Sequence, residues 1–118
     1  MVVDDTPHVL RMLSTMLTLD GFDVVAEAES GAAAIEMAGS VDPTVVVMDY
    51  RMPQLDGLQT ARALKEARPG LVIILYTAFI DGDLEREAAA SGVALCVGKV
   101  EGIGSLEREI SRLCATLA

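Results

Sequence analysis

Aromatic and basic residues are scarce in this sequence of 118 residues. Tryptophan is absent, and two tyrosines and two phenylalanines make up 3% of the chain, although 52% of it is hydrophobic. A core must therefore be built from aliphatic side chains and methionine, which suits helices packed on a parallel sheet and argues against disorder. Eighteen acidic residues against nine basic ones leave a net charge of −9. That charge argues against direct binding to nucleic acid or to an anionic membrane.

Cysteine and histidine are also rare. Cys96 and Cys114 stand far apart and His8 is the single histidine, so we expect two free thiols and no zinc site. His8 follows Pro7 at the start of a predicted helix and is expected to face solvent rather than donate a phosphoryl group or bind a metal. We find no signal peptide and no apolar run of transmembrane length, which predicts a soluble, cytoplasmic protein.

Short apolar runs alternate with helical patterns five times along the chain. Strands are predicted at 1–3, 22–28, 44–49, 71–77 and 93–98, and helices at 7–20, 30–40, 56–68, 81–92 and 103–117. The third and fourth strands are continuous apolar runs, typical of strands covered by helices on both faces. The alternation predicts an open α/β sheet with right-handed crossovers, in one domain spanning residues 1–118.

Two of these helices carry apolar residues at helical spacing. In the first, the residues are Val9, Met12, Leu13, Met16 and Leu17, and we expect the two methionines to pack in the core rather than to form a cofactor site. In the last, they are Ile103, Leu106, Ile110, Leu113 and Leu117. Both patterns predict helices lying on the sheet.

Polar residues stand at the carboxyl ends of four predicted strands, where ligands bind in open α/β sheets. They are Asp4 and Asp5, Asp49, Thr77 and Lys99. Three carboxylates so close together repel one another, and a hard divalent cation such as Mg²⁺ relieves the repulsion. A carboxylate beside the metal is a possible nucleophile toward a phosphoryl group, with Thr77 and Lys99 placed to bind its oxygens.

These residues occur within a longer pattern. Asp4-Asp5, MDYRMPQLDG at 48–57, LYTA at 75–78 and Lys99 together resemble the receiver domain of two-component response regulators. The resemblance spans essentially the whole chain. It implies a flavodoxin-like (βα)5 fold, an open doubly wound parallel sheet with strand order 2-1-3-4-5 and helices on both faces.

The resemblance also implies a mechanism. A sensor histidine kinase or phosphotransfer protein would transfer a phosphoryl group to Asp49. Asp5 and Asp49 would ligate Mg²⁺ directly, helped by the backbone carbonyl of Arg51, while Asp4 acts mainly through water and Pro53 and Gly57 shape the loop. Phosphorylation would change the surface of the fourth helix, fifth strand and fifth helix, where an output domain or target protein docks or a homodimer forms. The domain would catalyse only its own phosphorylation and dephosphorylation, so it is not an enzyme acting on an external substrate.

Three features depart from the receiver pattern. Val100 follows Lys99 where receivers usually have proline, Cys96 stands where they have tyrosine or phenylalanine, and the first strand is short. These departures favour an alternative, a phosphorylation-independent interaction or dimerisation module with weakened switching. A phosphohydrolase is opposed by Arg51, which occupies the place of its second acidic residue, and an FMN carrier by the acidic first loop. No output domain is present in the sequence.

Overall fold

Five parallel strands form one sheet in the order β2-β1-β3-β4-β5. This computed structural model describes the backbone of residues 1–117 and the side chains of residues 1–115. The strands are β1 (Val2–Val3), β2 (Glu27–Ala28), β3 (Val45–Met48), β4 (Val72–Thr77) and β5 (Leu95–Gly98). The helices are α1 (Pro7–Leu19), α2 (Gly31–Val41), α3 (Gly57–Ala67), α4 (Gly82–Ala90) and α5 (Ile103–Leu117), with a 3₁₀ turn, η1 (Lys99–Glu101), before α5. The predicted strand order is confirmed.

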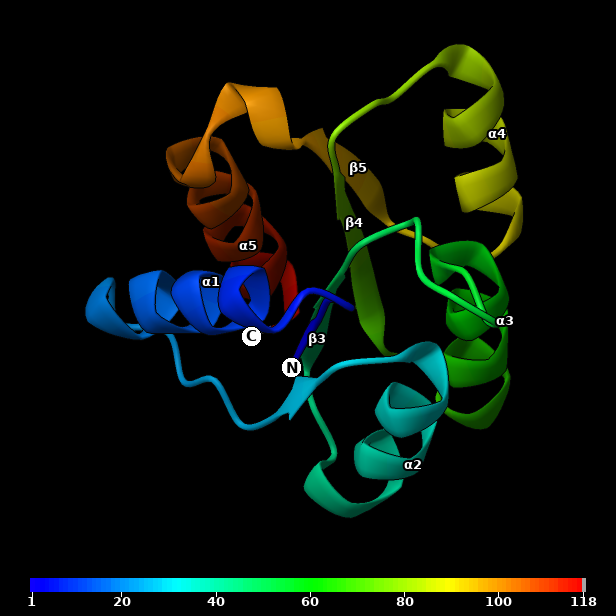
Figure 1. Cartoon of the computed structure of the whole chain (residues 1–118), viewed down its shortest axis with the longest axis horizontal. Helices are drawn as coiled ribbons and strands as arrows, with labels where there is room; N and C mark the ends of the chain where they lie inside the picture. The colour runs from blue at the N-terminus through cyan, green and yellow to red at the C-terminus, as the bar shows by residue number, and fades with distance from the viewer. Residues whose placement is uncertain (118) are drawn as a thin grey trace.

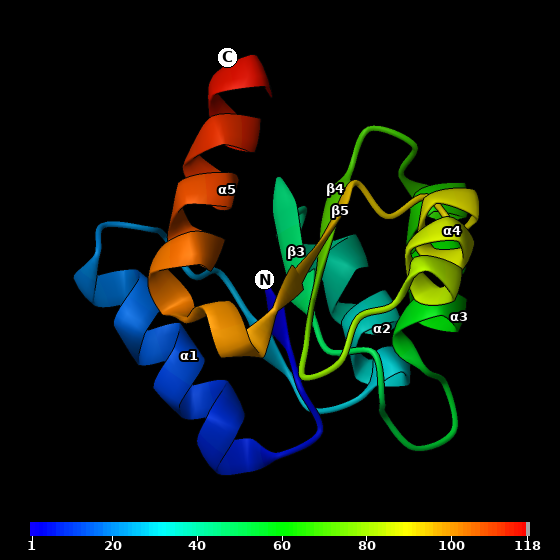
Figure 2. The same cartoon turned by 90° about the horizontal axis from the view of Figure 1, so that it is seen from above.

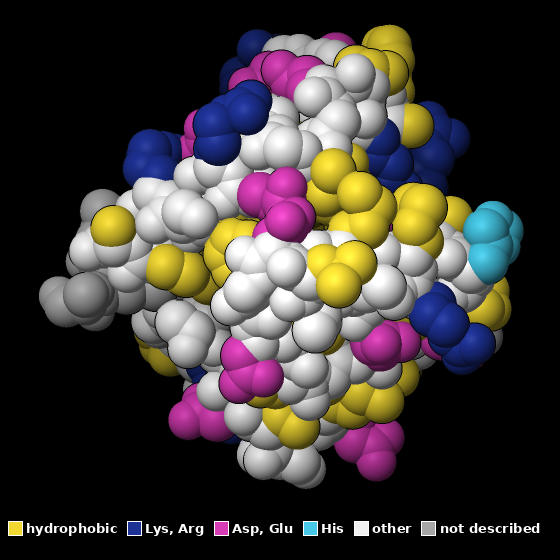
Figure 3. Space-filling model, turned by 90° about the vertical axis from the view of Figure 1, so that its left-hand side faces the viewer, with side chains coloured by type: hydrophobic (Ala, Val, Ile, Leu, Met, Phe, Trp, Pro, Cys, Tyr) yellow, Lys and Arg dark blue, Asp and Glu magenta, His cyan; other side chains and the backbone are white. Residues whose placement is uncertain are grey.

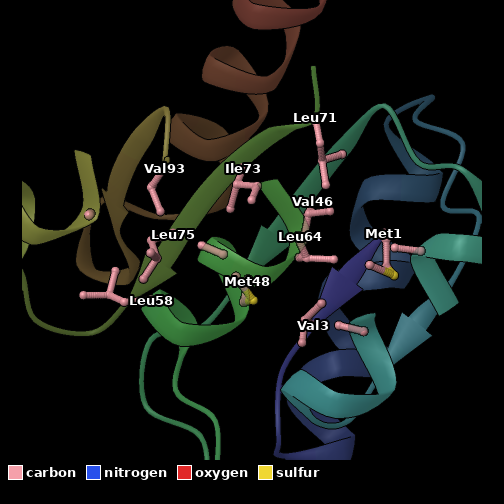
Figure 4. Close-up of a cluster of buried hydrophobic side chains, with 14 of the residues drawn as sticks. Met1, Val3, Val46, Met48, Leu58, Leu64, Leu71, Ile73, Leu75 and Val93 are labelled. Carbon is pink, nitrogen blue, oxygen red and sulfur yellow. The ribbon is translucent and has the colours of Figure 1, made fainter. Parts of the chain in front are cut away.

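Helices cover both faces of the sheet. α1 and α5 lie on one face, and α2, α3 and α4 lie on the other (Figures 1 and 2). Neighbouring residues of a strand point to opposite faces, so each central strand contributes to two cores. Val46, Met48, Ile73 and Leu75 pack with α2, α3 and α4 (Figure 4). Val47, Ile74, Tyr76 and Val97 pack with α1 and α5.

The first strand is short, as expected, and it limits the second. β1 pairs through only two residues with β2, Val2 opposite Glu27 and Val3 opposite Ala28. β2 is therefore confined to two residues, whereas the sequence predicted a strand over 22–28. The same two residues of β1 pair with Val47 and Met48 of β3, which places the end of β1 beside the end of β3.

The helix α1 buries fewer apolar residues than the sequence predicted. Leu10, Leu13 and Leu17 are buried against the sheet, whereas Met12 is 55% exposed and Met16 is only half-buried. The prediction that Met12 packs in the core is wrong, because the apolar residues of this helix wrap around more than one face. The outer face carries a second apolar stripe, spaced three or four residues apart, at Val9, Met12, Met16 and Leu19.

The helix α5 follows its predicted stripe. Leu106 and Ile110 are buried and Ile103 and Leu113 are half-buried, while the side chain of Leu117 lies outside the described residues. Cys96 and Cys114 are both free thiols, as expected. Over residues 1–117, no helix combines the length and hydropathy that a membrane span requires.

Candidate functional site

The polar residues predicted at the strand ends do come together. Asp4 and Asp5 follow β1, Asp49 follows β3, Thr77 ends β4 and Lys99 follows β5. The strands are parallel and in register, with Val3 beside Met48 and Thr77 beside Gly98, so their carboxyl ends lie at one edge. One carboxylate oxygen from each of the three aspartates lies within 4.8 Å of the others.

Lys99 brings a positive charge into this acidic cluster. Its Nζ lies 3.3 Å from Asp4 Oδ2 and 3.5 Å from Asp49 Oδ2. Burial alone would lower the pKa of Lys99, but the charges of Asp49 and Asp4 and the hydrogen bonds to both outweigh burial, so its pKa is raised. The ammonium therefore stays charged where it offsets two of the carboxylates.

Backbone amides orient the two carboxylates that Lys99 contacts. The Thr6 N–H donates to Asp4 Oδ1 at 2.9 Å, and the Tyr50 N–H donates to Asp49 Oδ1 at 2.8 Å. Each carboxylate thus turns its Oδ2 atom toward Lys99. Asp4 is buried, whereas Asp5 and Asp49 are partly exposed at the rim.

The other predicted residues differ in burial. Thr77 is 4% exposed and ends β4 at the same edge. Arg51 lies two residues beyond Asp49 with its side chain exposed. His8 is exposed on α1, as predicted.

The loop after Asp49 is held tightly against the start of α3. Gln54 has a positive φ of 68°, and the Gly57 N–H donates to the Tyr50 carbonyl at 2.7 Å. Asp56 and Gln59 form a reciprocal capping box at the first turn of α3. A Cβ on Gly57 would lie 2.5 Å from the Asp49 carbonyl oxygen and 2.9 Å from Tyr50 Cα. The loop can close this tightly only because residue 57 has no side chain.

Replacing Gly57 with alanine is therefore expected to destabilise the domain. The added methyl group forces the backbone at Asp49 to move, and overpacking of this kind costs about 1–3 kcal/mol. Gly39→Ala is the matched control, because the space around Gly39 is open within 4 Å and alanine favours the helix. Urea unfolding should give a lower midpoint for Gly57→Ala and an equal or higher midpoint for Gly39→Ala. Equal midpoints for Gly57→Ala and the parent would contradict the close approach.

Cys96, where receivers usually carry an aromatic residue, is half-buried against the core beneath α4. Burial, and next the charge of Glu85, raise the pKa of its thiol. A neutral thiol is a weak nucleophile, so Cys96 has the character of a packing residue. The Lys99–Val100 peptide bond is trans.

Tyr76 is a neighbour of the site that the sequence did not single out. It lies next to Thr77 in β4, and Lys99 Nζ lies 5.9 Å from the centroid of its ring. Burial raises the pKa of the Tyr76 hydroxyl, and the charge of Lys99 offsets part of this rise. The residue was hidden within the apolar run of β4, where only its place beside Thr77 set it apart.

The donor set fits a hard divalent cation. Three carboxylates with one ammonium leave two negative charges uncompensated at the cluster, and every candidate ligand atom is an oxygen. Mg²⁺ prefers such oxygen ligands together with water, and partial exposure of Asp5 and Asp49 leaves water access to the site. The arrangement brings together a candidate cation site, a partly exposed carboxylate and the ammonium of Lys99, with Thr77 at the same edge of the sheet.

Known proteins share this sequence pattern. Residues 1–111 match the family described as the response regulator receiver domain. The chain is 34% identical over 92 residues to the chemotaxis protein CheY of Bacillus subtilis, covering 78% of this chain and 77% of that protein. It is 35% identical over 92 residues to the regulatory protein AtoC of Escherichia coli, covering 78% of this chain but only 20% of AtoC. The chain therefore spans a small part of some relatives and most of others.

Solved structures agree. The receiver domain of the putative response regulator NarL from Mycobacterium tuberculosis superposes with a TM-score of 0.78 at 30% identity, covering 91% of this chain and 93% of that one. Vibrio cholerae CheY4 superposes with a TM-score of 0.87, covering 94% and 93%, and at 23% identity it supports the fold alone. Sequence and fold lead to the same conclusion: the chain belongs to the receiver domain family of two-component response regulators.

Proposed function

We propose that this domain is a phosphoacceptor switch in which Asp49 accepts a phosphoryl group from a phosphohistidine of a sensor histidine kinase or phosphotransfer protein. One observation carries the proposal. Asp49 stands at the rim of the sheet, partly exposed, within 4.8 Å of two other carboxylates and 3.5 Å from Lys99. Asp4 is buried behind it, so the carboxylate that meets an incoming phosphoryl group is that of Asp49 or Asp5. Of these two, only Asp49 contacts the lysine.

The transfer is a substitution at phosphorus. A carboxylate oxygen of Asp49 forms the new P–O bond as the P–N bond to the donor imidazole breaks, and the bonding electrons return to the imidazole nitrogen, which takes a proton from water. The Tyr50 N–H holds Asp49 Oδ1 and so fixes the plane of the nucleophile. Lys99 and Thr77 donate hydrogen bonds to the phosphoryl oxygens and offset their charge.

The acidic cluster is the proposed Mg²⁺ site. Asp5 and Asp49 would ligate the ion directly, together with the backbone carbonyl of Arg51, and Asp4 would act through water. Bound there, Mg²⁺ would neutralise charge on the carboxylates and on the phosphoryl oxygens. Asp4 suits the indirect role because it is the more deeply buried carboxylate: its side chain is 3% exposed, against 15% for Asp49.

The outer face of α1 supplies a surface for the protein that delivers the phosphoryl group. Met12 and Leu19 are 55% and 80% exposed, and with Val9 and Met16 they form a stripe with the spacing of a helix–helix contact. Figure 3 shows the side of the molecule that carries α1 and α5, where hydrophobic side chains lie exposed. α1 begins two residues after Asp5, so a helix docked along it lies close to the site.

On the output side, phosphorylation is proposed to change the surface formed by α4, β5 and α5. Phe79 and Val100 are 68% and 88% exposed near the ends of β4 and β5. Apolar side chains exposed beside a phosphorylation site offer contact area to an output domain, a target protein or a second copy of the domain.

The test is uptake of a phosphoryl group from acetyl phosphate, followed by intact mass spectrometry with Mg²⁺ or with a chelator. We expect a gain of one phosphoryl mass only with Mg²⁺, located on Asp49 by peptide mapping after reduction of the acyl phosphate. A chain that gains no mass with Mg²⁺ contradicts the proposal and favours the phosphorylation-independent interaction module.

A further inference from the structure

The ring of Tyr76 is a second neighbour of the Lys99 ammonium, in addition to the acidic cluster. Tyr76 is 8% exposed and belongs to the core between the sheet and the helices α1 and α5, with Val97 and Leu106. Lys99 Nζ lies 5.9 Å from the ring centroid, within the range of a cation–π contact. Lys99 therefore has two anionic contacts and one aromatic contact.

Among the interactions described for residues 1–115, the side chain of Lys99 has no partner besides Asp4, Asp49 and Tyr76. It begins the 3₁₀ turn η1 directly after β5, and its neighbour Val100 is 88% exposed, so the following residue contributes little packing. A lysine side chain loses roughly 1.5–2 kcal/mol of rotamer freedom when it is held in one conformation. Contacts around the side chain itself must offset that cost.

We propose that Tyr76 is a positioning residue for Lys99, and that the face of its ring keeps the ammonium at the site while the carboxylates change partners. The consequence for catalysis rests on the proposed phosphoacceptor function. The carboxylates of Asp4 and Asp49 contact Lys99 in the structure, but the phosphorylated domain needs the same ammonium to bind phosphoryl oxygens. The ring is neutral and competes for neither partner, so its contact persists through the transfer.

The contact requires an aromatic face but no hydroxyl group. Phenylalanine at position 76 keeps the ring, whereas leucine keeps the apolar volume approximately and loses the electrostatic attraction for a cation. Ile74→Val is the matched control, because Ile74 lies two residues earlier in β4, in the same core as Tyr76 and without contact to Lys99 among the described interactions. It removes a similar volume from that core.

The experiment combines two measurements on the full chain. NMR of the parent should show the Lys99 ε-methylene protons shifted upfield by the ring current of Tyr76. The shift should remain in Tyr76→Phe and Ile74→Val and disappear in Tyr76→Leu. With Mg²⁺ and acetyl phosphate, the rate of phosphorylation should fall about threefold in Tyr76→Leu and stay near the parent rate in Tyr76→Phe, since a cation–π contact at a partly exposed lysine is modest in strength.

The outcomes separate the two proposals. Unshifted Lys99 protons in the parent overturn the positioning role, even if the leucine variant does not fold. A normal phosphorylation rate in Tyr76→Leu, or a loss as large in Ile74→Val, also overturns it. If the parent takes up no phosphoryl group, the proposed function fails, and the ring-current shift alone decides whether Tyr76 holds Lys99.

Discussion

Replacement of Asp49 with asparagine is expected to abolish the Mg²⁺-dependent uptake of a phosphoryl group and to leave the fold intact. The amide keeps the shape of the side chain but lacks the nucleophilic oxygen anion, so no acyl phosphate forms. Stability without Mg²⁺ should be equal or slightly higher, because the change removes one of three mutually repelling carboxylates within 4.8 Å. Intact mass and urea unfolding measure the two effects separately.

Asp56→Asn is the matched control for this substitution. Asp56 lies in the same loop, but its side chain caps α3 by accepting a hydrogen bond from the Gln59 N–H, and asparagine caps helices equally well. Phosphorylation and stability should both match the parent. Continued modification of Asp49→Asn would place the acceptor elsewhere, with the partly exposed Asp5 as the first residue to map.

Mg²⁺ should stabilise the parent more than Asp49→Asn. A ligand that binds only the folded state raises the free energy of unfolding by RT ln(1 + [L]/Kd). Loss of one carboxylate weakens the cation site, so the rise in unfolding midpoint with Mg²⁺ concentration should be smaller in the variant. This measurement of unfolding midpoints needs no phosphoryl donor, so it separates metal binding from the chemistry of the acceptor residue.

The convergence of the polar residues could be predicted from the sequence because it follows from strand direction. The apolar runs of β3 and β4 locate two central parallel strands, and whatever follows them must lie at one edge of the sheet. The sequence therefore predicts that Asp49 and Thr77 lie at the same edge of the sheet, even though it gives no distance between them. The strand order could not be predicted from the hydrophobic pattern, because that pattern locates strands without saying which ones are neighbours. The order was predicted from the resemblance to receiver domains.

The orientation of α1 could not be predicted in the same way. The predicted apolar residues, Val9, Met12, Leu13, Met16 and Leu17, fit a helical period, yet the apolar residues that are buried are Leu10, Leu13 and Leu17. A helix with apolar residues on two adjacent faces satisfies the period in either orientation, and only packing on the sheet decides between them. The same limit concealed Tyr76. Alternation along β4 assigns it to a face, but contact with a lysine more than twenty residues later depends on the tertiary structure.

Cys96 and Tyr76 lie on opposite faces of the sheet. Cys96 packs toward α4, in the core of Val46 and Met48, whereas Tyr76 packs toward α1 and α5. An aromatic side chain in contact with Lys99 is therefore present, but on the other face of the sheet from position 96. If Lys99 moves when the proposed phosphoryl group binds, its contact with Tyr76 links that movement to the core beneath α5, which includes Leu106.

Replacing Lys99 with methionine is expected to destabilise the domain by about 2 kcal/mol at pH 7 without Mg²⁺ and to slow phosphorylation strongly. Removing one member of a buried ion pair costs about 3–5 kcal/mol, and the partial exposure of Lys99, 29% of its side chain, lowers that figure. Asp4, with a side chain only 3% exposed, would lose its cationic partner. Arg86→Met is the control, because it breaks an exposed ion pair with Asp83 and should cost little.

The pH dependence of this loss tests its cause. The pKa of Lys99 in the folded protein is raised above its ordinary value of 10.5. A group with a raised folded-state pKa contributes stability that is fully present below the unfolded pKa and is lost as the pH rises through the folded pKa. The difference in unfolding free energy between the parent and Lys99→Met should therefore be constant from neutral pH to about pH 9 and shrink above pH 10.5. A difference that persists unchanged at higher pH would assign the loss to packing of the lysine stem instead of to its charge.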